Sequence, residues 1–143
     1  RLRPIGLYHQ RASQLARLAH ALDASGSVPQ GSSGLAELPG VGPYSAAIVA
    51  AIFYGEALVG IDTNVARVFA RVFGLTGTRS EDRKSPEFWD LGAALAGEVG
   101  SAVADLNWAF IDLGALICKP KSPRCHDCPL SVDCHFAAGN SKG

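Results

Sequence analysis

Four cysteines near the C-terminal end carry the clearest chemical signal in the sequence. They are Cys118, Cys125, Cys128 and Cys134, in the spacing C-x6-C-x2-C-x5-C. So dense a group of thiols in a chain with no sign of secretion favours a bound metal centre over two disulfides. Structural zinc prefers two close pairs of ligands, and only Cys125 and Cys128 form one, whereas an iron–sulfur cluster also takes four thiolates and accepts other spacings. His126 and His135 lie nearby, and we interpret both as bystanders.

A basic segment lies between the first two cysteines. It reads Lys-Pro-Lys-Ser-Pro-Arg, and its charges come from Lys119, Lys121 and Arg124. The whole chain has 13 basic and 13 acidic residues, so a polyanionic partner has to be bound by a local patch. We predict that these three residues contact a phosphate backbone.

A glycine-rich turn, Leu38-Pro39-Gly40-Val41-Gly42, precedes an alanine-rich segment that is expected to be a helix from Pro43 to Tyr54 and to stop at Gly55. Glycines at the entrance of a helix let backbone N–H groups approach an anion. The phosphate loop and the dinucleotide fingerprint are excluded, because the residues that complete them are missing. A nucleic-acid backbone is the remaining ligand, and a helix–turn–helix connection without any ligand is the alternative.

A second helix is predicted to begin near Asp62 and Thr63 and to end at Gly74. From the residues alone, Asp62 is best explained as the N-cap of this helix. Arg67 and Arg71 are four residues apart and share a face. They are expected either to face solvent or to meet phosphates.

The other predicted elements are also helical. We expect helices over 9–24, over 86–97 after the cap Ser85, and over 102–117, a linker over 25–34 and a polar loop over 74–84. The predicted class is therefore all-α.

No apolar run is expected to reach the roughly 18 residues of a membrane span and no signal peptide is visible, which predicts a cytoplasmic chain without a membrane partner. The chain has no methionine and begins at Arg1, so we expect a fragment of a longer protein.

Three motifs in this order resemble a known family. LPGVGPYSA, IDTNVARV and DLGALIC with its cysteine array look like the helix-hairpin-helix (HhH-GPD) DNA glycosylase superfamily, in the branch of endonuclease III, the adenine glycosylase MutY and the thymine mismatch glycosylases. The resemblance covers nearly the whole chain. It implies a hairpin at 38–42 that grips DNA, a catalytic Asp62, and a 4Fe-4S cluster on the four cysteines. It divides the chain into a partial helical glycosylase domain, 1–117, and a cluster loop and tail, 118–143.

Glycosylases extrude a base and cut its bond to the sugar through an oxocarbenium-like state. A carboxylate beneath the sugar stabilises that charge, which is the role the resemblance gives to Asp62. Asn64, in the same motif, is predicted to order the backbone or to contact DNA. Tyr44 stands where lyase-competent members carry a Schiff-base lysine, so we predict a monofunctional enzyme that leaves an abasic site. The alternative for Tyr44 is packing or a simple surface contact.

The excised base is predicted to be thymine or uracil opposite guanine, or adenine opposite guanine or 8-oxoguanine. Residues 6–12, from Gly6 to Ala12, look closer to the thymine mismatch group. Trp108, just after Asn107, departs from the Gln or Glu of the MutY pattern, which argues against adenine. The helices that carry a wedge into the duplex in this family, and a catalytic glutamate in MutY, are expected to precede Arg1.

Two alternatives stay open. One is an endonuclease III-like glycosylase and lyase acting on oxidised pyrimidines, which Tyr44 disfavours. The other is an iron–sulfur DNA-binding module without catalysis, which fits the zero net charge. In each case the expected partner is double-stranded DNA, for the enzymes with a mismatched or damaged base. The chain is expected to be a monomer at the bacterial nucleoid.

Overall fold

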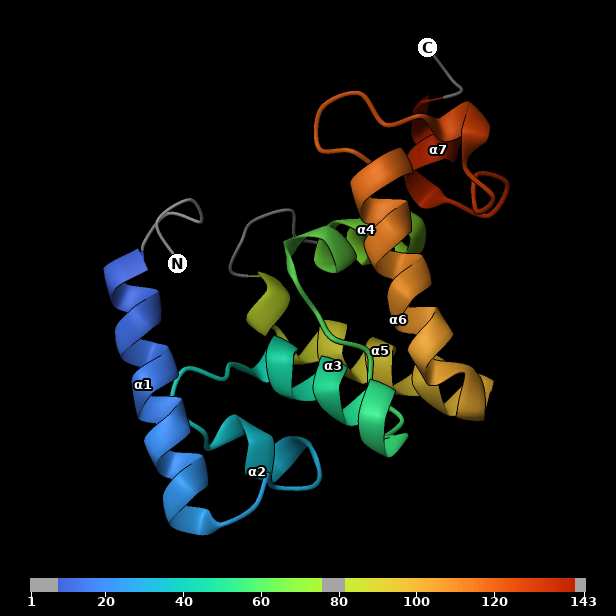
Figure 1. Cartoon of the computed structure of the whole chain (residues 1–143). Helices are drawn as coiled ribbons and strands as arrows, with labels where there is room; N and C mark the ends of the chain where they lie inside the picture. The colour runs from blue at the N-terminus through green and yellow to red at the C-terminus, as the bar shows by residue number, and fades with distance from the viewer. Residues whose placement is uncertain (1–7, 76–81, 141–143) are drawn as a thin grey trace.

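The computed structural model describes residues 8–75 and 82–140, and within these ranges the chain is helical without strands (Figure 1). The all-α prediction is confirmed. Gly6 and Leu7, from the motif at 6–12, and the middle of the predicted polar loop lie outside the described residues. The elements are α1 Tyr8–Ser25, α2 Ser32–Ala36, α3 Pro43–Tyr54, α4 Thr63–Phe73, η2 Asp82–Lys84, α5 Pro86–Val99, η3 Gly100–Ala102, α6 Val103–Asp112, the π-helix η4 Leu113–Ile117, η5 Cys125–Asp127 and α7 His135–Asn140.

The two central helices begin and end where the sequence predicts. Pro43 opens α3 and Gly55 ends it in a left-handed conformation, at φ 69°. Asp62 caps α4, and Gly74 ends that helix at φ 70°. These ends follow from local residue chemistry, because proline suits the first helical turn and glycine tolerates positive φ.

The predicted linker over 25–34 is wrong in its second half, because α2 begins at Ser32. Five residues that include two serines and a glycine have little intrinsic tendency to form a helix. Tertiary contacts supply the stability: Leu35 is buried, and Glu56 Oε1 accepts a hydrogen bond from the Ser32 N–H at 3.0 Å. Helix α2, the glycine turn and α3 therefore form one helix–hairpin–helix unit.

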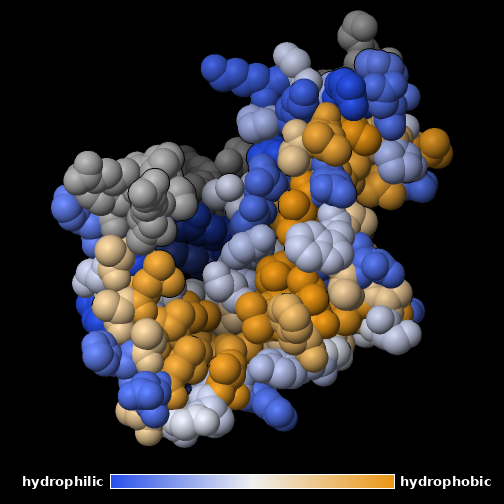
Figure 2. Space-filling view, in the orientation of Figure 1, coloured by the Kyte–Doolittle hydropathy of each residue, from blue (hydrophilic) through white to orange (hydrophobic). Residues whose placement is uncertain are grey.

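The main core lies between α4, α5 and α6. Phe69, Phe88 and Phe110 are buried there, and the rings of Phe69 and Phe110 meet edge to face with centroids 5.0 Å apart. A smaller cluster of Leu35, Ala46 and Ala50 joins α2 to α3. Figure 2 shows an apolar band on this face of the molecule, over α1, α2 and α3. The start of α4, which carries the predicted catalytic carboxylate, is thus seated on the larger core.

The helical stretch Pro86–Ile117 is long and apolar enough, by length and composition alone, to cross a membrane. This corrects the expectation that no run reaches that length. Gly100, at φ 53° and ψ −118°, breaks the stretch into α5 of 14 residues and α6 of 10 residues. Neither helix reaches the roughly 20 residues that a bilayer requires, and Phe88 and Phe110 belong to the core described above.

Candidate active site

Asp62 and Tyr44, the two predicted catalytic residues, line the same pocket of about 460 Å³. The pocket lies where the glycine turn enters α3 and the segment before α4 passes beside it. Its other lining residues are Gly42, Pro43, Ile61, Arg83, Lys84 and Trp89. The structure therefore brings the carboxylate, the phenol and one end of the hairpin together, as the resemblance implies.

The Asp62 carboxylate is held by three hydrogen bonds. Its Oδ1 atom accepts from the backbone N–H groups of Asn64 and Val65, both at 2.8 Å, and its Oδ2 atom accepts from Asn64 Nδ2 at 3.1 Å. The side chain is therefore an N-cap, as the residues alone suggest, and it also borders the pocket. Because the cap fixes its orientation, the carboxylate does not have to reorganise to act on a ligand there.

Tyr44 presents a neutral phenol to the pocket. Partial burial raises the pKa of Tyr44, and the negative charge of Asp62 raises it further. The hydroxyl is therefore a hydrogen-bond donor at neutral pH. Gly60 makes this packing possible, because a Cβ atom there would lie 2.6 Å from Ile48 Cγ1 and 3.1 Å from Tyr44 Cδ2.

Asn64 is engaged inside the protein on both sides of its amide. Besides donating to Asp62, it accepts a hydrogen bond at Oδ1 from Arg67 Nη2, at 2.9 Å. The same Arg67 donates to the carbonyls of Gly114 and Cys118, each at 2.8 Å. These contacts support a role in ordering the carboxylate, and a contact between Asn64 and DNA stays a prediction.

Arg71 lies next to the first cysteine. It donates to Cys118 Sγ at 3.4 Å and to the carbonyls of Lys119 and Pro120 at 2.7 and 2.9 Å, and it stacks over the Phe136 ring at 4.7 Å. Arg67 and Arg71 therefore tie α4 to the C-terminal loop, a role that neither the solvent nor the phosphate interpretation included. Helical spacing reveals a shared face but not what packs on it.

All four cysteines are free thiols that line one pocket, together with α4 side chains and apolar residues of η4 and α7. Burial raises the pKa of the Cys125 thiol, and the charges of Cys134, Cys118 and Cys128 raise it further. Within the described ranges no three His, Cys, Asp or Glu side chains converge closely enough for a single metal ion. The four thiols share one pocket, and the metal that they hold stays a prediction.

The two histidines interpreted as bystanders are not among the residues that line this pocket. His126 is 81% exposed and lies 3.4 Å from Asp127. His135 packs against Gly74, whose added Cβ would lie 2.9 Å from the imidazole ring.

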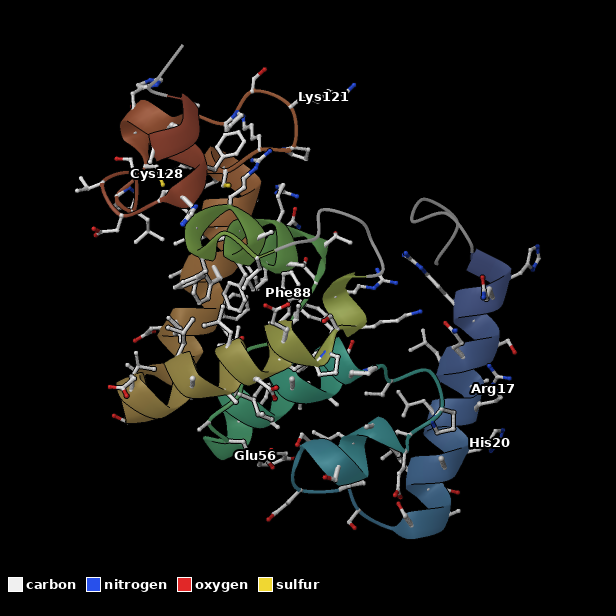
Figure 3. All side chains as sticks on the ribbon, turned by 180° about the vertical axis from the view of Figure 1, so that it is seen from behind. Arg17, His20, Glu56, Phe88, Lys121 and Cys128 are labelled. Carbon is white, nitrogen blue, oxygen red and sulfur yellow. The ribbon has the colours of Figure 1, made fainter. Side chains whose placement is uncertain are left out.

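The basic segment forms a surface loop that is closed by one carbonyl. The N–H groups of Lys119 and Arg124 both donate to Ile117 O, at 2.9 and 3.0 Å. Lys119 and Lys121 are exposed, and Figure 3 shows Lys121 projecting from the loop. Arg124 pairs with Asp127 at 3.4 Å and is half exposed. Contact of these three residues with DNA stays a prediction.

The glycine turn at Leu38–Gly42 is a tight connection between α2 and α3. The Val41 N–H donates to Leu38 O at 3.1 Å, and Gly40 has φ 84°. A Cβ atom at Gly40 would lie 3.3 Å from Gln14 Cβ on α1, so α1 supports the turn from behind. The predicted hairpin geometry is present, and its DNA contact stays a prediction.

Sequence reasoning missed several residues around the pocket. Arg83, Lys84 and Trp89 line it but carry no motif. Asn107 is only 1% exposed and donates to the carbonyls of Leu58 and Val103 while accepting from the Gly60 N–H, all at 2.9 Å. An asparagine within an apolar helical pattern is the signal that could have found it, because a buried amide needs partners. Trp108, beside it, is 51% exposed, and nothing in the structure gives it a role.

Comparisons with known proteins agree with this geometry, although no family model matches the chain. The chain is 32% identical over 137 residues to the thymine-DNA glycosylase of Aeropyrum pernix, and 34% identical over 137 residues to the thymine/uracil-DNA glycosylase of Methanothermobacter thermautotrophicus. Each of these alignments covers 94% of this chain and 61% of the relative. The adenine DNA glycosylase of Arabidopsis thaliana is 33% identical over 128 residues, which are 89% of this chain and 20% of that protein.

Two solved structures show the same fold. A thermostable thymine-DNA glycosylase superposes with a TM-score of 0.83 at 34% identity, over 94% of this chain and 62% of that one. Endonuclease III in a non-covalent complex with DNA superposes with a TM-score of 0.78 at 27% identity, over 99% of this chain and 64% of that one.

The chain belongs to the helix-hairpin-helix DNA glycosylase superfamily. Its relatives include thymine, thymine/uracil and adenine glycosylases, and its structural neighbours include endonuclease III, so the resemblance of the three motifs is confirmed at the level of the superfamily. The chain spans about three fifths of the length of the two thymine glycosylases that it matches.

Proposed function

We propose that this chain is the catalytic part of a monofunctional, mismatch-specific DNA glycosylase in base excision repair. The observation that carries the proposal is the Asp62 carboxylate, fixed by its cap hydrogen bonds and lining one pocket with Tyr44 beside the hairpin. The names of the relatives support glycosylase chemistry.

In the proposed reaction, the target nucleotide leaves the duplex and its sugar sits in the pocket above Asp62. The bond between sugar C1′ and the base nitrogen breaks, and the leaving base takes both bonding electrons and then a proton from solvent, which the proton later released by Asp62 replaces. Asp62 stabilises the positive charge on the sugar and accepts a proton from the water that adds to C1′. The Tyr44 hydroxyl donates a hydrogen bond to the DNA strand. Tyr44 has no amine with which to form a Schiff base, so the product is an abasic site.

One observation favours a second candidate, a glycosylase with lyase activity on oxidised pyrimidines. Lys84 lines the same pocket as Asp62, so a lysine is near the sugar although Tyr44 occupies the expected lysine position. Borohydride traps a Schiff base between enzyme and DNA. A trapped adduct that disappears in Lys84→Gln would establish the lyase, and its absence would support the monofunctional enzyme.

We propose thymine or uracil opposite guanine as the first substrates to test, since two relatives are named for these bases. Adenine opposite guanine or 8-oxoguanine is the second choice, because Trp108 departs from the MutY pattern. The test is base release from duplexes carrying T:G, U:G, A:G and A:8-oxoguanine, with the protein at its natural length. Release from none of them would overturn the proposed activity.

Asp62→Asn tests the catalytic role of the carboxylate. The amide keeps an oxygen for the two backbone N–H groups but lacks the charge, so we expect base release to fall by about 10³-fold or more, which is about 4 kcal/mol of lost transition-state stabilisation. Duplex affinity should change less than threefold. Base release at the unsubstituted rate would refute the assignment of Asp62.

We further propose that Cys118, Cys125, Cys128 and Cys134 hold a 4Fe-4S cluster. The pocket that they share fits the group, and the arginine contacts to Cys118 and its neighbours hold that ligand in place. Bound there, the cluster would staple the C-terminal loop to α4. Iron and sulfide analysis with absorbance near about 400 nm tests this, and zinc in its place would refute it. A monomeric protein acting at the bacterial nucleoid completes the proposal.

A further inference from the structure

We propose that Arg83 and Lys84 form a phosphate-binding wall that holds the backbone of the extruded nucleotide, across the pocket from the hairpin. The ligand is a phosphodiester flanking that nucleotide. The inference deepens the proposed function and rests on it for the presence of an extruded nucleotide in the pocket.

The wall is placed by the short helix η2, Asp82–Lys84, immediately before α5. Trp89 on α5 donates its indole N–H to Arg83 O at 2.8 Å, and Trp89 packs against the main core. The backbone that carries the two cations is therefore fixed relative to Asp62. Figures 1 and 3 both show η2 beside the first turn of α3, from opposite sides of the molecule, and Figure 2 shows hydrophilic side chains in a recess at this position.

The charges of the pocket select an anionic ligand. Among the described residues that line it, two side chains are cations, Arg83 and Lys84, and one is a carboxylate, Asp62. The first turn of α3, a helix of 12 residues, adds its positive end at Gly42 and Pro43. An excised base is neutral and does not need two cations, whereas a nucleotide in a strand carries a phosphate on each side.

The geometry assigns one positive element to each of these phosphates. A strand that places a sugar over Asp62 passes between the start of α3 and η2, because both border the pocket. The start of α3 meets the phosphate on one side and Arg83 with Lys84 meets the phosphate on the other. Arg83 and Lys84 line the pocket itself, so the proposed wall contacts a nucleotide that has entered the pocket, whereas the loop with Lys119 and Lys121 does not line it.

The test compares the affinity of the protein at its natural length for two duplexes. One is undamaged, and the other carries a tetrahydrofuran abasic-site analogue, which presents an extruded sugar with its phosphates. For Arg83→Gln/Lys84→Gln we expect at least about a tenfold loss of affinity for the analogue, and a decrease of about one to two in the slope of log affinity against log salt. Affinity for the undamaged duplex should change less than twofold.

Two controls make the result specific. Arg17→Gln removes an exposed arginine on α1 and should change neither affinity, while Lys119→Gln/Lys121→Gln should weaken both duplexes alike. Arg83→Lys keeps the charge and should restore most of the lost slope. Because Trp89 bonds to the backbone carbonyl of Arg83, the substitutions keep this contact, and circular dichroism checks that each variant is folded before its affinity is compared. Equal losses on both duplexes, or an unchanged salt slope for the analogue, would overturn the phosphate wall.

The binding test is separate from the activity test. Base release with an unchanged salt slope would refute the wall and leave the glycosylase intact. A reduced slope on the analogue without base release from any mispair would support the wall and refute the proposed activity.

Discussion

Replacing Asn107 with leucine should destabilise the protein through the segment that leads into Asp62. The Asn107 amide is the hydrogen-bond partner of the Gly60 N–H and of the Leu58 carbonyl. Leucine is similar in size but leaves these two buried groups without a partner. At about 1–3 kcal/mol for each unsatisfied group, the free energy of unfolding should fall by about 2–6 kcal/mol. Urea unfolding followed by circular dichroism measures this loss, and a change below about 0.5 kcal/mol would refute the reasoning.

Asn107→Asp tests the same site through pH. An aspartate keeps an acceptor for the Gly60 N–H, but its second oxygen faces the carbonyls of Leu58 and Val103, must carry a proton to bond there, and can donate to only one of them. Folding therefore raises the pKa of the new carboxyl above its unfolded value of about 3.9. The variant should be most stable below pH 4, where it lacks one donated hydrogen bond, and should lose further stability, relative to wild type, as the pH rises through the raised pKa, by up to about 1.4 kcal/mol per pH unit.

Ala109→Asp is the matched control, because this residue is exposed on the same helix. A carboxylate there stays in water, so its stability relative to wild type should not depend on pH. A flat difference between Asn107→Asp and wild type from pH 4 to pH 8 would mean that the amide donors of Asn107 do not hold the Leu58–Gly60 segment.

Two further predictions concern the carboxylate and its neighbour. Arg67→Met removes the hydrogen bonds to Asn64, Gly114 and Cys118. A hydrogen bond to a charged group contributes about 1.5–3 kcal/mol and water compensates for part of the loss, so the free energy of unfolding should fall by about 2–4 kcal/mol. Urea titration measures this fall, and wild-type stability would contradict the prediction. Tyr44→Phe removes a phenol whose pKa is raised in the folded state, so the folded protein resists ionisation that the unfolded chain undergoes near pH 10. The wild type should accordingly lose stability as the pH rises from 10 through the raised pKa, whereas the variant should lose less, and equal slopes in urea unfolding between pH 9 and 11 would count against the burial of the hydroxyl.

The ends of α3 and α4 could be predicted because single residues specify them. Pro43, Gly55, Asp62 and Gly74 each act within one turn of the backbone that they start or stop. Helix α2 could not be predicted in this way, since its first N–H is capped by Glu56, which lies 24 positions further along the chain. Its stability is tertiary, and local pattern does not report it.

The residues of the candidate active site also fall into those that local sequence predicts and those that only tertiary packing brings together. Asp62 and Tyr44 lie in motifs that can be read along the chain, whereas Arg83, Lys84 and Trp89 join them only because η2 packs against α4 and α5. Arg67 and Arg71 were placed on the correct helix face, but the loop that covers this face begins at Cys118. Contacts between segments so far apart in sequence depend on the packing of the whole fold.

One carbonyl closes the Lys119–Arg124 loop, and it separates the positions of the cysteines from the charge and length of the loop. Ile117 O joins both ends of the loop, and Arg71 binds the carbonyls of Lys119 and Pro120, so backbone groups rather than the side chains between Cys118 and Cys125 hold the loop. Positive charge can be added to or removed from this loop, and its length can be altered at Lys121 and Ser122, without repacking α4 or disturbing the thiols. The proposed DNA contact of this loop is therefore open to change independently of the proposed metal centre.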